Sequence, residues 1–150
     1  SSLLKKGVNT FKVTSPTKLS EPVRLVGDFD VKTEGKDFIL TEPCEMEPLS
    51  PEKTYPWYSG TTEYKAVLDI EDAACSFELD LHDVGDSAEV FVNGISAGKR
   101  LWFPYRWNIS SLVKSGENDI KIQTRGDLSA MITGVSRPYG LRKVPVVLQS

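Results

Sequence analysis

The chain has 150 residues, 39% of them apolar, and its 18 lysines and arginines against 21 aspartates and glutamates give a net charge of −3. A chain of this length buries roughly 70% of its unfolded surface, so we expect a single domain over residues 1–150. The acidic balance supplies no basic field for phosphates or anionic lipid, and no apolar run approaches the roughly 20 residues that span a bilayer, which excludes nucleic acid and membranes as first candidates.

Apolar and polar residues alternate along much of the chain, whereas helical periodicity is nearly absent. The clearest alternation places Cys75, Phe77, Leu79 and Leu81 on one face, which is typical of a half-buried strand. A helical turn is predicted only at residues 110–114. In chain order, the strands are predicted at residues 10–13, 23–31, 38–41, 64–70, 74–81, 88–92, 95–101, 105–109, 120–122 and 144–148.

Short strands separated by turn signals, without intervening helices, predict an all-β fold, an antiparallel β-sandwich of the jelly-roll type. Residues 42–60 depart from this rhythm because they contain four prolines, which cannot donate to a sheet ladder. The same stretch is rich in aromatic residues, so we interpret it as a long crossing loop that packs on the sandwich and not as a linker between domains. No internal repeat is recognised.

Cysteines and the single histidine offer little metal chemistry. Cys44 and Cys75 are far apart in the sequence and fit neither a metal-ligand spacing nor a disulfide framework, so free thiols are expected. With only His82 beside them, a closed zinc site is not expected. Structural calcium stays open because it needs only oxygen ligands, although no Asp-x-Asp-x-Asp loop is present, and no other cofactor is expected.

No catalytic residue is predicted. Residues 94–98 match the G-x-S-x-G pattern of serine hydrolases, but the strand before them runs into an Asn-Gly hairpin turn and not into a helix. Nothing in the sequence positions His82 beside Ser96. A carboxylate pair for glycoside hydrolysis is also not favoured, since most acidic residues lie on the outward faces of the predicted strands.

Aromatic residues gather in two short segments, 55–58 and 102–107, which together hold all three tryptophans. Aromatic faces can pack on the C–H faces of a sugar ring while arginine orients hydroxyl groups by hydrogen bonds. The same residues can equally cover the core or form an interface with a neighbouring domain, so both interpretations stay open. In the second segment, alternation predicts Trp107 and Ile109 in the core and leaves Trp102 and Arg106 for exposed contacts.

Several motifs occur in an order that identifies a family resemblance. They are YSGTTEY at residues 58–64, LDLHDV at 79–84, AEVFVNG at 88–94, WFPYR at 102–106 and GEN at 116–118. This order resembles the sugar-binding jelly roll of glycoside hydrolase family 2 and is similar to the galactose-binding-like domains of bacterial glycosidases such as the large α-L-rhamnosidases. The resemblance covers about residues 55–150.

The resemblance implies a non-catalytic, carbohydrate-binding or accessory domain of a bacterial glycoside hydrolase. Its implied partners are carbohydrate and a catalytic domain of the same polypeptide, commonly a barrel. In family 2 the stretch before the last strand can reach the mouth of that barrel, which would place Asp127 and the loop 137–139 near the pocket. A secreted or periplasmic parent enzyme is favoured over a cytoplasmic one. The candidate ligand-binding residues are Trp57, Tyr58, Trp102, Tyr105, Arg106, Arg137 and Tyr139.

The alternative is a purely structural β-sandwich that packs against the catalytic barrel and has no sugar site of its own. The N-terminus, which has neither an initiating Met nor a signal-peptide pattern, suggests a piece excised from a longer protein.

Overall fold

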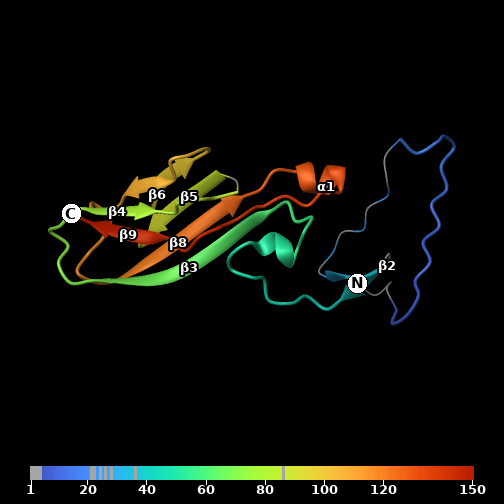
Figure 1. The fold of residues 1–150 in the computed structure, drawn as a ribbon, viewed down its shortest axis with the longest axis horizontal. Helices are drawn as coiled ribbons and strands as arrows, with labels where there is room; N and C mark the ends of the chain where they lie inside the picture. Colours follow the sequence, from blue (N-terminus) through green and yellow to red (C-terminus); the bar gives the residue numbers. More distant parts are fainter. Residues whose placement is uncertain are drawn as a thin grey trace.

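The computed structural model describes residues 5–20, 23, 25, 27, 29–35, 37–85 and 87–150 (Figure 1). Its strands are β1 (Asp30–Glu34), β2 (Asp37–Thr41), β3 (Thr61–Ile70), β4 (Phe77–Asp80), β5 (Ser87–Val92), β6 (Ile95–Arg100), β7 (Arg106–Asn108), β8 (Gly116–Arg125) and β9 (Val146–Gln149). A 3₁₀ helix, η1 (Pro51–Lys53), and a short α-helix, α1 (Ser129–Thr133), complete the elements. No helix of the described part is long and apolar enough to cross a membrane.

Two antiparallel sheets form the body of the molecule. The four-stranded sheet has the order β3-β8-β5-β6, and the three-stranded sheet has the order β7-β4-β9. A separate hairpin, β1-β2, lies beyond the end of the sandwich with the N-terminal segment (Figure 1). The predicted antiparallel β-sandwich is therefore confirmed.

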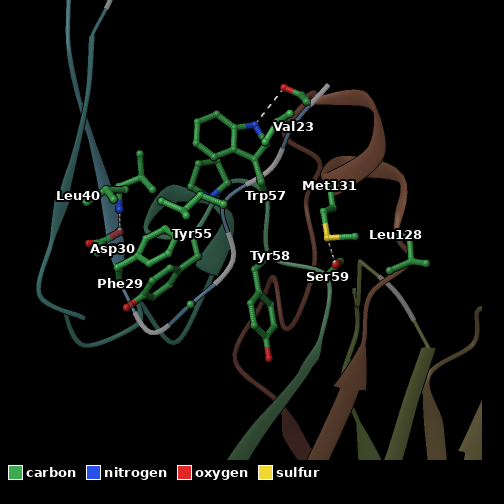
Figure 2. A pocket seen from close by; sticks show the side chains of 15 residues that line it. Val23, Phe29, Asp30, Leu40, Tyr55, Trp57, Tyr58, Ser59, Leu128 and Met131 are labelled. Atoms are coloured by element: carbon green, nitrogen blue, oxygen red, sulfur yellow. Dashed lines mark hydrogen bonds between the residues drawn. The ribbon is translucent and has the colours of Figure 1, made fainter. Parts of the chain in front are cut away.

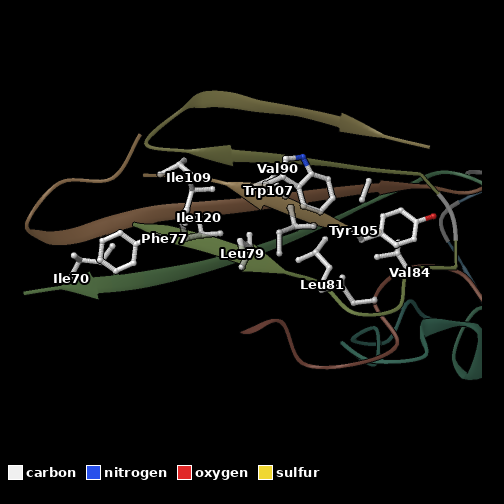
Figure 3. Close-up of a cluster of buried hydrophobic side chains, with 14 residues drawn as sticks. Ile70, Phe77, Leu79, Leu81, Val84, Val90, Tyr105, Trp107, Ile109 and Ile120 are labelled. Carbon is white, nitrogen blue, oxygen red and sulfur yellow. The ribbon is translucent and has the colours of Figure 1, made fainter. Parts of the chain in front are cut away.

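The core lies between the two sheets and takes alternate residues from their strands (Figure 3). In β5, Val90 and Val92 are fully buried while the residues between them are partly exposed. The other sheet contributes Leu79 from β4 and Trp107 from β7. The period of two that the sequence shows thus corresponds to burial on one face of each strand.

Turn residues support this layout. Asn93 and Gly94 have φ angles of 51° and 81°, and the positive values at both central positions suit the tight hairpin that joins β5 to β6. The predicted Asn-Gly hairpin is confirmed. The helical turn predicted at residues 110–114 is a hydrogen-bonded turn over residues 110–112. In this turn the amide of Leu112 donates to the carbonyl of Ile109 at 2.9 Å.

The Pro-rich segment 42–60 crosses the end of the sandwich. Leu49 packs against the core, Pro51 is buried, and the amide of Ser50 donates to the carbonyl of Leu141 at 3.1 Å. These contacts fix the segment to the last part of the chain.

Other expectations differ from the structure. Residues 10–13 are not in a strand, and the predicted strand at 23–31 falls partly outside the described residues, with β1 beginning only at Asp30. The helix α1 was not predicted because five residues are too few to show a helical period. Cys44 and Cys75 are free, as expected.

Candidate functional site

A groove of about 970 Å³ opens between the β1-β2 hairpin, residues 55–59 and α1 (Figure 2). Its walls are mainly apolar, and the residues that form them include Phe29, Leu40, Trp57, Tyr58, Leu128 and Met131. Trp57 and Tyr58 are two of the predicted ligand-binding residues. The groove therefore brings together part of the first aromatic segment with side chains that the sequence did not single out.

Two hydrogen bonds hold the aromatic segment against α1. The indole Nε1 of Trp57 donates to the carbonyl of Gly134 at 3.0 Å, and the hydroxyl of Ser59 donates to the sulfur of Met131 at 3.6 Å (Figure 2). Gly134 ends α1 in the left-handed conformation with a φ angle of 70°, which glycine adopts without steric cost. The edge of the groove thus depends on the end of this short helix.

The ring of Tyr58 packs against the ring of Tyr139. Their ring centroids are 5.6 Å apart, and the hydroxyl of Tyr58 donates to the carbonyl of Thr61 at 2.9 Å. Tyr139 is buried, and its hydroxyl lies 3.2 Å from the carbonyl of Pro51 and 3.0 Å from that of Tyr55. Burial raises the pKa of Tyr139 above its ordinary value. Tyr139 therefore positions the groove residues and does not offer its own ring to a ligand.

The polar groups on the β1 side of the groove are already paired. One carboxylate oxygen of the buried Asp30 accepts from the amide of Val31 at 2.6 Å, and the other accepts from the thiol of Cys44 at 2.9 Å. That bond raises the pKa of the Cys44 thiol. The hydroxyl of Tyr55 donates to the carbonyl of Cys44 at 2.7 Å, and burial raises the pKa of Tyr55.

The second aromatic segment lies outside the groove and divides between core and surface. Tyr105, Trp107 and Ile109 are buried, so the prediction that Trp107 and Ile109 are core residues is confirmed. Because Tyr105 lies in the same core, its ring does not face a ligand. Trp107 donates from Nε1 to the carbonyl of Gly98 at 2.9 Å.

Three consecutive apolar residues are exposed in the turn between β6 and β7. Leu101, Trp102 and Phe103 are 59%, 72% and 71% exposed. We call these three residues the β6–β7 turn. Trp102 is thus well exposed, as the alternation of the segment predicts, but it lies among apolar side chains and not in the groove.

Arg106 is held by carboxylates beside this turn. Its Nε lies 2.9 Å from an oxygen of the buried Asp80, and its Nη1 lies 3.6 Å from an oxygen of Glu78. Asp80 also accepts from the backbone amide of His82 at 2.7 Å. His82 therefore lies just beyond the end of β4 and contacts Asp80. About half of the Arg106 side chain is exposed.

Arg137 is exposed and does not line the groove. It lies near Asp127, whose pKa is held below its ordinary value by hydrogen bonds from Ser129 and, to a smaller extent, by the charge of Arg137. Ser96, on the β5-β6 hairpin, donates its hydroxyl to a carboxylate oxygen of Glu89 at 2.8 Å. Among the described residues, no group of three or more His, Cys, Asp or Glu side chains could hold a metal ion.

Phe29, Leu40, Leu128 and Met131 line the groove without having been predicted. They come from segments that precede and follow the aromatic segment by many residues. The apolar residues Leu128, Met131 and Ile132 are a weak sequence signal, but nothing in the sequence places them beside Trp57.

No family model matches the chain. Among curated proteins, a part of the chain is similar to a protein of Formosa agariphila named "Putative beta-glucuronidase", with 25% identity over 119 residues that cover 73% of this chain and 10% of that protein. Among solved structures, a rhamnosidase from Novosphingobium sp. PP1Y aligns with a TM-score of 0.61 and 22% identity over 93% of this chain and 16% of its own. A β-glucuronidase of Bacteroides uniformis aligns with a TM-score of 0.50 and 20% identity, over 61% of this chain and 12% of its own.

The chain thus spans only a small fraction of each protein that it matches, between 10% and 16% in these three cases. The two solved structures share its fold, and the curated relative shares a quarter of the aligned residues. In fold and sequence, the chain is similar to a β-sandwich portion of much longer glycoside hydrolases.

Proposed function

We propose that the chain is a non-catalytic accessory domain of a glycoside hydrolase and that its β6–β7 turn packs against another domain of the same polypeptide. The similarity to small portions of longer proteins with glucuronidase and rhamnosidase names supports the first part. Ser96 takes no catalytic role in this proposal because it lies in β6 of the β5-β6 hairpin and not in the strand–turn–helix elbow that a G-x-S-x-G nucleophile needs.

The exposure of the β6–β7 turn is the observation that carries the second part. Three consecutive large apolar side chains project from a turn between two strands of the sandwich, although each would gain about 1.5–3 kcal/mol from full burial. Contiguous exposed apolar surface of this kind marks a contact surface. Arg106, beside the turn, adds a half-exposed cation that a neighbouring domain can use for a rim contact.

The test compares Trp102→Ser and Phe103→Ser in the 150-residue chain and in the full natural polypeptide. We expect little change in the Tm of the short chain, because both side chains are exposed there, and a Tm several degrees lower for this domain in the full polypeptide. The matched control is Val67→Ser on β3, which removes an apolar side chain that is 63% exposed. Equal small effects of all three substitutions in both proteins would contradict the proposed contact.

Carbohydrate binding in the groove is the second candidate, favoured by the presence of Trp57 and Tyr58 in one groove wall. Their rings offer apolar faces of the kind that sugar C–H groups cover. We expect dissociation constants of roughly micromolar to millimolar, insensitive to salt. Calorimetry with a glycan panel should show binding that Trp57→Ala abolishes and Trp102→Ala preserves. Absence of binding across the panel would remove this candidate.

A further inference from the structure

Residues 5–13 repeat the pattern of residues 114–122, where β8 begins. The two stretches read KKGVNTFKV and KSGENDIKI, with Lys, Gly, Asn and Lys at the same spacing and apolar residues at the same two later positions. Their overall identity is too low and their length too short for the repeat to stand out in the sequence. The hydrogen bonds of the structure identify it.

In the second copy, the side chain of Asn118 closes the turn that precedes β8. Its Oδ1 accepts from the amide of Lys114 at 2.8 Å, and its Nδ2 donates to the carbonyls of Lys114 at 2.7 Å and of Gly116 at 2.8 Å. Gly116 has a φ angle of 87°, in the region that favours glycine. The turn therefore depends on both the glycine and the asparagine.

The first copy has the same three hydrogen bonds. The Oδ1 of Asn9 accepts from the amide of Lys5 at 2.9 Å, and its Nδ2 donates to the carbonyls of Lys5 at 2.7 Å and of Gly7 at 2.9 Å. Gly7 has a φ angle of 100°. Residues 5–9 thus form the same turn as the one that starts a central strand of the sandwich.

The surroundings of the two copies differ. Asn118 is fully buried and is also bonded to the segments on both sides, accepting from Nδ2 of Asn93 in the turn after β5 at 2.9 Å and donating to the carbonyl of Leu68 in β3 at 3.4 Å. The next inward residues, Ile120 and Ile122, are only 6% and 5% exposed. This is the environment of a strand that has a neighbour on each side, here β3 and β5.

In the first copy the corresponding apolar residues face solvent. Phe11 and Val13, which match Ile120 and Ile122, are 60% and 54% exposed. Among the described residues no strand pairs with residues 7–14, and the segment runs away from both sheets (Figure 1). Residues 5–9 therefore form the turn that precedes a central strand elsewhere in the chain, and the alternating residues after it pair with no strand of the described chain.

We infer that residues 7–14 are a strand of a second β-sandwich in the same polypeptide, paired on both sides by strands from outside this chain as β8 is paired by β3 and β5. Another copy of this chain does not fit as the partner, because its own β8 already fills the central position. An edge strand of a second copy could pair with residues 7–14 on one side only, whereas the strand that contains Asn118 has a neighbouring strand on each side. The inference rests on the chain being part of a longer protein and does not depend on the β6–β7 turn or on sugar binding.

Hydrogen exchange measured by mass spectrometry tests it in the 150-residue chain and in the full natural polypeptide. We expect the amides of residues 8–14 to exchange at least about 100-fold more slowly in the full polypeptide, because strand pairing protects them there. The amides of β8 serve as the internal reference and stay protected in both proteins. Equally fast exchange of residues 8–14 in both proteins would overturn the inference.

Two adjacent substitutions separate pairing from non-specific contact. Phe11→Asp changes a residue that the repeat assigns to the core face, and Thr10→Asp changes the opposite face, matching the exposed Asp119. Phe11→Asp should remove the protection in the full polypeptide, and Thr10→Asp should leave it. Equal effects would overturn the inference, as would protection in the 150-residue chain that increases with protein concentration, since the partner would then be a second copy.

Discussion

The side chains of Asn93 and Asn118 are joined by a hydrogen bond of 2.9 Å from Nδ2 to Oδ1. Asn93 also accepts from the amide of Asp119 at 3.1 Å through its Oδ1 and donates to the carbonyl of Leu112 at 2.9 Å. The hairpin turn after β5 and the start of β8 are therefore joined by these amide side chains and by a backbone bond from the amide of Asn93 to the carbonyl of Asp119 at 2.8 Å. Two turns distant in sequence act as one unit at this end of the sandwich.

Replacement of Asn118 by Ala should lower the free energy of unfolding by about 3 kcal/mol, because several buried backbone groups lose their partner. Urea denaturation measures this value. The control is Asn108→Ala on β7, whose side chain is exposed and accepts one hydrogen bond, from Ser110. Its cost should stay below about 1 kcal/mol. Similar costs for the two substitutions would contradict the assigned role of Asn118.

Tyr139→Phe should cost about 1 kcal/mol near neutral pH, because it removes the hydroxyl that bonds to the Pro-rich segment. It should also change the alkaline pH dependence. Burial raises the pKa of Tyr139 from 10.0, so above pH 10 the unfolded chain loses this proton while the folded chain keeps it.

The stability that Tyr139 contributes is therefore complete below pH 10 and is lost progressively as the pH rises above it. In the Phe variant the free energy of unfolding should fall less steeply above about pH 10. Denaturation at a series of pH values measures the two slopes, and parallel slopes would show that Tyr139 does not titrate as described.

Gly140→Ala should be more destabilising than Gly134→Ala, although the two glycines have nearly equal φ angles of 69° and 70°. A Cβ at residue 134 would meet open space, whereas one at residue 140 would clash with the hydroxyl of Tyr64 and lie 2.9 Å from Cγ of Pro51. We expect about 1 kcal/mol for residue 134 from backbone strain and at least about 3 kcal/mol for residue 140. Thermal unfolding compares them, and equal Tm values would refute the close approach.

The two carboxylates that contact Arg106 should differ in their importance. Asp80→Asn removes the buried carboxylate charge that lies 2.9 Å from Nε of Arg106. We expect the free energy of unfolding to fall by about 2 kcal/mol. Glu78→Gln affects a longer and largely exposed contact, so its cost should be at most about 0.5 kcal/mol. Chemical denaturation measures the free energy of unfolding of both variants. A larger loss for Glu78→Gln than for Asp80→Asn would contradict the prediction.

Much of the sandwich could be predicted because burial on one face leaves a period of two in the sequence. Residues 88–92 show it fully, since Ala88, Val90 and Val92 are all completely buried. Residues 10–13 show the same alternation and were predicted as a strand for the same reason, yet the described chain provides no partner for them. Alternation reports the character of a strand and carries no information about where its neighbours are.

The groove was less predictable. The aromatic segment that holds Trp57 and Tyr58 stood out by composition alone. Its opposite wall did not, because the hydrogen bond from Trp57 to Gly134 joins residues 77 positions apart and depends on a five-residue helix. Contacts between distant segments that are themselves irregular leave no periodic trace in a sequence.

The place of β8 in the sheet has a consequence for how the chain folds. β8 pairs with β3 on one side and β5 on the other, and its partners in β3 lie 46 to 64 residues earlier in the chain, from Ile70 opposite Gly116 to Thr61 opposite Arg125. During synthesis the hairpins β1-β2 and β5-β6 can form early, but the four-stranded sheet cannot close until β8 has emerged as far as residue 125, and β9 completes the second sheet still later. Such distant pairing makes folding slow, so the apolar faces of β3 and β5 stay open to other molecules until β8 arrives between them.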